Sequence, residues 1–78
     1  MLTGKRFRIA TETLAVTQSS VGRRTTVTIP AGEIVKVVSG PSGEGLVDVL
    51  WNGQIFDMFE IDLQLRGEEL PDVSEAHT

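Results

Sequence analysis

Two mostly apolar, strand-like segments predict a β-hairpin in the second half of the chain. The segments LVDVLW (46–51) and QIFDMF (54–59) are rich in apolar residues and are separated only by an Asn-Gly pair. Both central residues of a type I′ turn need positive φ, and Asn-Gly meets that need at low cost. The turn fixes the pairing of the two strands, so that Asp48 lies opposite Asp57.

A third strand is predicted at EIVKVVS (33–39), next to the first strand of the hairpin. Pairing Lys36 with Asp48 sets apolar residues opposite one another at the other positions of these two strands. Because side chains alternate between the faces of a sheet, one face becomes almost wholly apolar. We expect this face to form the core. It is composed of Val35, Val37, Val47, Val49, Trp51, Phe56 and Met58.

The opposite face of the same three strands is also largely apolar, although a sheet with one solvated face should be polar on that side. Its apolar members are Ile34, Val38, Leu46, Leu50, Ile55 and Phe59, and a single polar row of Lys36, Asp48 and Asp57 crosses them. Residues 7–16 and 59–65 could cover this face within the chain. If they do not, it is an interaction face for a protein partner or for a second copy of the chain.

The remaining segments predict short extended elements joined by turns. A strand is expected from about Arg6 within residues 5–16, a polar loop at 17–24, and an extended segment that ends at a Pro-Ala-Gly turn. The 39–45 stretch is a loop rich in glycine. A single helical or 3₁₀ turn near 59–62 precedes a last short strand at about 64–66. Residues 68–78 are acidic and broken by proline, and we expect them to form a disordered acidic tail after a domain that spans 1–67.

This order of elements resembles an SH3-like barrel over about residues 5–67. The resemblance implies an all-β fold, a small barrel of five to six strands with one 3₁₀ turn, but it specifies no ligand. Peptide-binding SH3 domains use tyrosines and tryptophans to bind polyproline, whereas this chain has no tyrosine and one tryptophan, Trp51. It also resembles the type II dihydrofolate reductases in size. Their Val-Gln-Ile-Tyr motif is absent, although Gln64 lies between two leucines, and we do not transfer the activity.

Composition and charge narrow the functional classes. The chain has 78 residues, no cysteine and a net charge of −4. Residues 1–36 hold six Lys and Arg against two Asp and Glu, and residues 37–78 hold one against nine.

The longest apolar runs are too short to span a membrane. No secretory leader is visible, so we expect a cytoplasmic protein with no membrane partner. Histidine occurs once, at position 77 in the predicted tail, and no metal or cofactor is expected.

Two groups of charged residues are candidate sites. Asp48 and Asp57 lie opposite each other and should repel, and Lys36 in the same row should neutralise them. Such a pair could also serve acid–base chemistry or bind a cation. The basic residues of the first half could contact phosphates. They are Lys5, Arg6, Arg8, Arg23 and Arg24.

Three functions follow from these observations. The first is a small binding or assembly module that uses the apolar outer face. The second is a nucleic-acid contact module, which the negative net charge disfavours. The third is an enzyme whose site forms only at the axis of an oligomer and uses Asp48, Asp57, Lys36 or Gln64. We favour the first, because the sequence contains no catalytic constellation.

Overall fold

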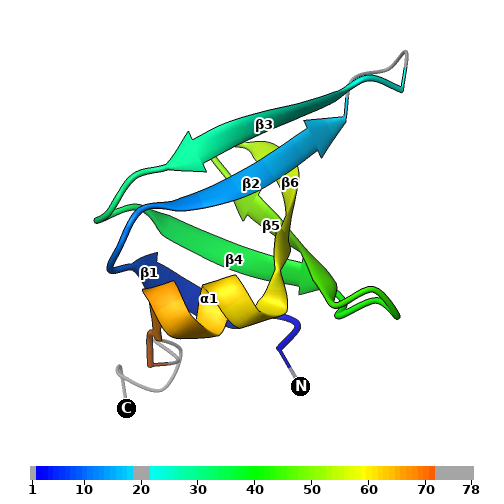
Figure 1. The fold of residues 1–78 in the computed structure, drawn as a ribbon. Helices are drawn as coiled ribbons and strands as arrows, with labels where there is room; N and C mark the ends of the chain where they lie inside the picture. Colours follow the sequence, from blue (N-terminus) through cyan, green and yellow to red (C-terminus); the bar gives the residue numbers. More distant parts are fainter. Residues whose placement is uncertain (1, 19–21, 72–78) are drawn as a thin grey trace.

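A computed structural model describes residues 2–18 and 22–71 as a mainly β structure. The elements are β1 (Arg6–Ile9), β2 (Thr13–Gln18), β3 (Arg24–Ile29), β4 (Ile34–Ser39), β5 (Leu46–Trp51), β6 (Gln54–Phe59), α1 (Glu60–Arg66) and β7 (Gly67–Glu69). The strands form one antiparallel sheet in the order β3-β2-β6-β5-β4-β1-β7, and the sheet is strongly curled (Figure 1). The all-β expectation is confirmed. The described residues form seven strands where five to six were expected.

The β5–β6 hairpin has the predicted turn and the predicted register. Asn52 has φ 53° and Gly53 has φ 74°, as a type I′ turn requires. All six cross-strand pairs are the expected ones: Leu46–Phe59, Val47–Met58, Asp48–Asp57, Val49–Phe56, Leu50–Ile55 and Trp51–Gln54.

The register predicted between β4 and β5 is wrong. Lys36 lies opposite Leu50 rather than Asp48, and a β-bulge after Val37 brings Ser39 opposite Asp48. At Lys36 and Val37 the shift is two residues, which keeps both side chains on their expected faces, so the apolar pattern cannot distinguish the two registers there. Beyond the bulge, Ser39 turns its side chain toward Asp48. The bulge places an extra residue in β4.

The strand expected within residues 5–16 is two strands. β1 pairs with β4 and β7, whereas β2 pairs with β3 and β6. At the break between them, the backbone N–H groups of Ala10 and Thr11 both donate to the carbonyl of Arg66, at 2.7 and 3.1 Å. These two hydrogen bonds satisfy backbone N–H groups at the point where the chain passes from β1 to β2. Of the predicted 17–24 loop, residues 19–21 lie outside the described part of the chain.

The end of the domain differs from the prediction. α1 extends to Arg66, so the strand expected at 64–66 is wrong and β7 follows the helix instead. Acidic residues in the first turn and Arg66 in the last turn favour this helix through the helix dipole. The tail prediction is wrong for Glu68 and Glu69, which belong to β7. Residues 72–78 lie outside the described residues.

The core occupies the inner side of the curled sheet and includes the predicted apolar face. Every strand except β7 contributes to it, and Leu63 of α1 completes it. Its buried residues are Phe7, Ile9, Ala15, Ile29, Val35, Val37, Val47, Val49, Phe56, Met58 and Leu63. Trp51 is partly buried and donates its indole N–H to Glu33 Oε1 at 2.8 Å.

Candidate interaction face

The outward face of β4, β5 and β6 is exposed, and its apolar members are those predicted. Exposed fractions are 47% for Ile34 and Ile55, 39% for Leu50, 37% for Val38 and 53% for Phe59, and Leu46 is half-buried. Neither the first strands nor α1 closes over it. We refer to these six residues, together with Lys36, Asp48 and Asp57, as the outward face.

Asp48 and Asp57 are coupled at the centre of this face. Ser39 Oγ donates to Asp48 Oδ2 at 2.6 Å. A hydrogen bond with Asp48 raises the pKa of Asp57 to about 6, with help from partial burial and from the charge of Asp48, while Arg24 opposes the shift. The pKa of Asp48 is lowered by its hydrogen bonds with Asp57 and then with Ser39. Below about pH 6 the pair therefore holds one proton, on Asp57, that is shared with an ionised Asp48.

Lys36 does not neutralise this pair as predicted. The bulge after Val37 leaves Lys36 between Leu50 of β5 and Arg6 of β1, and Ser39 takes the place beside Asp48. The described residues show no ion pair between Lys36 and either aspartate. Excess negative charge is therefore left at the centre of an apolar surface once Asp57 ionises.

The shared proton predicts a pH-dependent stability that Asp57→Asn removes. The folded-state pKa of Asp57 lies above its ordinary value of 3.8, so its stabilising effect is present below about pH 4 and is lost as the pH rises through about 6. Asparagine keeps a donor toward Asp48 without ionising. We expect Asp57→Asn to match the wild type in urea unfolding at pH 4 and to exceed it by about 1 kcal/mol at pH 7.5. A stability difference that does not change between the two pH values contradicts the shared proton.

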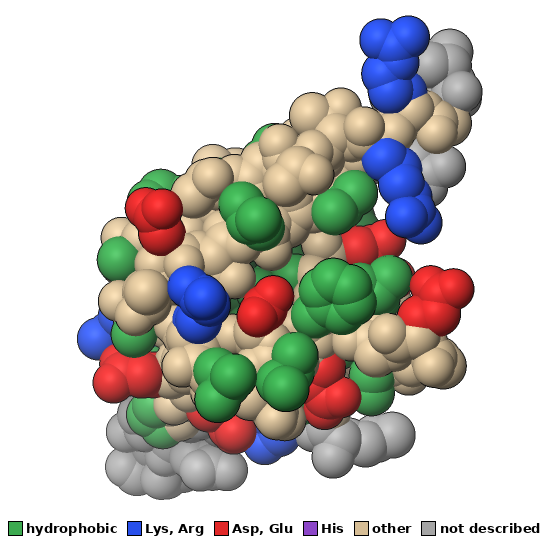
Figure 2. Space-filling view, viewed as in Figure 1, with side chains coloured by type: hydrophobic (Ala, Val, Ile, Leu, Met, Phe, Trp, Pro, Cys, Tyr) green, Lys and Arg blue, Asp and Glu red, His purple; other side chains and the backbone are tan. Residues whose placement is uncertain are grey.

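A groove runs beside the aspartate pair, where β2 approaches β6. Val16 pairs with Asp57 across these strands. Two adjoining hollows of about 260 and 230 Å³ lie here, with Asp57 in both. Their shared apolar walls are Val16, Leu46 and Phe59. Figure 2 shows hydrophobic side chains gathered between the β2–β3 hairpin and α1, with acidic side chains among them.

The two ends of the groove carry opposite charges. Leu14 and Asp62 line the hollow nearer to α1, and Arg24 lines the other. Leu14, Val16 and Asp62 were not predicted as site residues. Leu14 and Val16 belong to an unbroken apolar run with Ala15, so no local pattern marks them, and their approach to β6 depends on the long-range pairing of β2.

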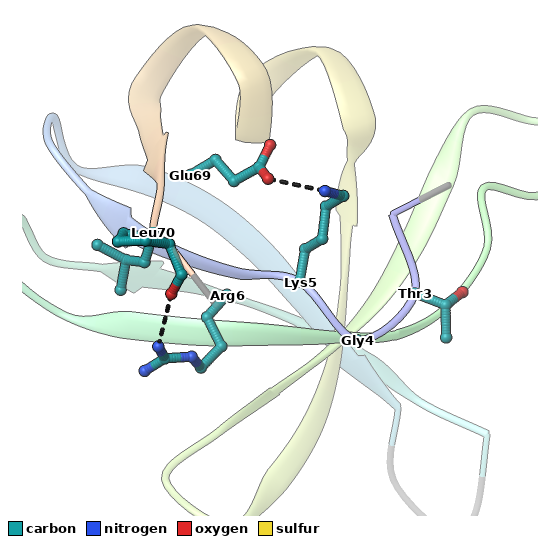
Figure 3. Close-up of a pocket in the computed structure, with 7 residues that line it drawn as sticks. Thr3, Gly4, Lys5, Arg6, Glu69 and Leu70 are labelled. Carbon is teal, nitrogen blue, oxygen red and sulfur yellow. Dashed lines mark hydrogen bonds and ion pairs between the residues drawn. The ribbon is translucent and has the colours of Figure 1, made fainter. Parts of the chain in front are cut away.

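The five predicted phosphate-contacting residues do not gather in one place. Lys5 Nζ lies 2.8 Å from Glu69 Oε2, and a guanidinium nitrogen of Arg6 donates to the carbonyl of Pro71 at 3.1 Å (Figure 3). Arg8 lies 4.0 Å from Glu68. Arg23 and Arg24 belong instead to the β2–β3 hairpin, at whose tip Figure 2 shows basic side chains.

The cavity that Figure 3 shows is polar, and its charged lining residues are Lys5, Arg6 and Glu69. It measures about 370 Å³ and is lined by residues 3–6 and 69–71. Glu69 contacts Lys5, just before β1, and Glu68 contacts Arg8 of β1, so these carboxylates offset part of the positive charge at this end of the sheet.

The remaining candidates also stay apart. Gln64 lies on α1 and donates to Glu60 Oε2 at 3.3 Å, so a single chain does not bring Lys36 or Gln64 to the aspartate pair. Within residues 2–18 and 22–71, no three acidic or histidine side chains cluster as metal ligands would. His77 lies outside the described residues. The described helix is too short to cross a membrane.

Comparisons with protein families, with curated proteins and with solved structures find no match for this chain.

Proposed function

We propose that the chain is a non-catalytic protein-binding module on an SH3-like, partly open barrel. The sheet supports the fold, because its seven described strands form one curled antiparallel sheet in which the last strand, β7, lies beside the first, β1. A helix joins β6 to β7, and the long β2–β3 hairpin lies between β1 and β4, as the first loop of such barrels does.

The groove is the proposed binding site, and its occupant is an extended segment of a protein partner with apolar side chains on either side of a lysine or arginine. The observation that carries this proposal is an ionisable carboxyl, Asp57, that lines both hollows of the groove beside Val16, Leu46 and Phe59. Val16, Leu46 and Phe59 provide apolar contacts. A full leucine side chain gains about 1.5–3 kcal/mol when it is buried.

The aspartate pair gives the groove its preference for a basic residue. At pH 7 Asp57 is mostly ionised, since its pKa is about 6, and the two carboxylates then repel each other. A cation from the partner replaces the shared proton and stabilises both charges. Below pH 6 the proton competes with the cation. Binding of a basic segment should therefore weaken as the pH falls through about 6.

Two labelled tripeptides test this proposal by fluorescence anisotropy. Acetyl-Leu-Lys-Leu-amide carries the basic residue, and norleucine replaces lysine in its control. We expect Asp57→Asn to weaken binding of the lysine peptide at pH 7.5 about threefold, as a partly exposed ion pair of about 0.2–1 kcal/mol would, and to leave the norleucine peptide unchanged.

Glu44→Gln is the matched variant, because it removes an exposed carboxylate from the loop before β5 without touching the groove. It should affect neither peptide. The proposal fails if Asp57→Asn and Glu44→Gln weaken the lysine peptide equally, or if neither peptide binds at millimolar concentration.

A further inference from the structure

The sheet is open, and its two edges are protected to very different degrees. At one edge β7 is only three residues long, carries Glu68 and Glu69, and is followed closely by Pro71. Short length, charge and proline are the features by which natural proteins keep an edge strand from pairing with another chain. This edge is therefore closed to further strands.

The other edge, β3, is twice as long as β7 and is less protected, although Pro30 follows it directly. Its six residues, RTTVTI, include five β-branched side chains and no proline, and the single charge is Arg24 at the first position. Its neighbour in the sheet is β2, and no described backbone hydrogen bond joins β3 to any other segment. A strand of this length and composition presents unpaired N–H and C=O groups to solvent.

We propose that β3 pairs antiparallel with β3 of a second copy, so that two sheets join into one across a two-fold axis. The axis falls at Val27, so that Val27 of one copy lies opposite Val27 of the other. Thr26 then lies opposite Thr28 and Thr25 opposite Ile29, and each pair shares a face of the joined sheet. A two-fold interface requires a segment that fits a second copy of itself. Antiparallel pairing places the two Arg24 side chains at opposite ends of the interface, so they do not repel each other.

Charges on the neighbouring strand favour the antiparallel arrangement. Thr13 of β2 pairs with Ile29, which places Glu12 just beyond the end of β3. Arg24 of one copy therefore comes to within two strand spacings, about 10 Å, of Glu12 of the other, a span that the two long side chains can bridge. Parallel pairing would instead place the two Arg24 side chains together. The charges at this edge therefore favour a second copy of the chain as the partner of β3.

Sedimentation equilibrium of the full chain at pH 7.5 tests the proposal. We expect a monomer–dimer equilibrium. Thr26→Lys places two positive charges beside the axis and should raise the dissociation constant at least fivefold, whereas Thr26→Val keeps the β-branched side chain and should leave it unchanged. Circular dichroism melts at a concentration where only monomer is present show whether each variant folds.

A charge exchange tests the register without relying on Thr26. Glu12→Lys and Arg24→Glu should each weaken the dimer about fivefold, because each removes two symmetry-related ion pairs, and the double variant should restore it. A wild-type chain that sediments as a monomer at millimolar concentration overturns the proposal. So does a dimer that Leu50→Lys on the outward face abolishes while Thr26→Lys leaves it intact. Peptide binding in the groove is measured on variants that leave β3 unchanged, because Thr26 and Arg24 also line its hollows.

Discussion

Replacing Leu63 with alanine is expected to lower the free energy of unfolding by about 3 kcal/mol. Leu63 is fully buried and is the residue that α1 contributes to the core. Deleting a buried leucine side chain loses its transfer free energy and leaves a cavity, at a cost of about 2–5 kcal/mol. A domain of this size has a total stability of roughly 4–12 kcal/mol. The midpoint of thermal unfolding should fall by roughly 12–24 °C, which circular dichroism measures.

Leu65→Ala provides the control within the same helix. Leu65 is 76% exposed, so its removal takes away little buried surface, and alanine favours a helix at least as well as leucine. The change in unfolding free energy should stay within about 0.5 kcal/mol. Equal losses for Leu63→Ala and Leu65→Ala would show that α1 does not pack against the sheet in the orientation described.

Gly40→Ala is expected to destabilise the fold by at least about 2 kcal/mol. Gly40 has φ 101°, a conformation that a residue with a side chain adopts only with strain. A Cβ atom there would lie 2.9 Å from the carbonyl oxygen of Leu46 and 3.1 Å from Cα of Val47. Both atoms belong to the backbone of β5, so relief requires the strands to move apart. Urea unfolding measures the loss.

Gly43→Ala in the same loop separates this strain from a general effect of replacing glycine. A Cβ atom at Gly43 meets nothing within 4 Å, and its φ is not positive. Its replacement should be neutral, or slightly stabilising because it restricts the unfolded chain. If both variants lose the same stability, the close approach of Gly40 to β5 is not what constrains the loop.

Local patterns predict the part of this fold that depends on neighbours in sequence. The Asn-Gly turn and the alternation around it suffice for the β5–β6 register, for the buried valines and for the exposed Leu50 and Ile55. They do not predict the bulge after Val37. At Lys36 and Val37 the two-residue shift changes neither side chain's face, so only the hydrogen bonding of the folded sheet distinguishes the two registers there.

The predictions that were wrong or incomplete concern segments in which long-range contacts override local sequence preference. The break between β1 and β2 exists because the two segments pair with different strands, and its exposed backbone groups bond to Arg66 far along the chain. α1 extends past the predicted turn because Leu63 gains full burial. The groove was missed for the same reason: Leu14 and Val16 become site residues only when β2 lies against β6.

The central claim is that the groove beside Asp57 binds an apolar segment that carries a basic residue. Amide chemical shifts of the ¹⁵N-labelled chain, followed during titration with acetyl-Leu-Lys-Leu-amide at pH 7.5, test it most directly. The claim predicts that the shifts gather at Val16, Leu46, Asp57 and Phe59, that β7 stays unperturbed, and that the shifts diminish at pH 5. Shifts that are spread evenly over the chain, or that centre on the cavity beside Lys5 and Glu69, would contradict it.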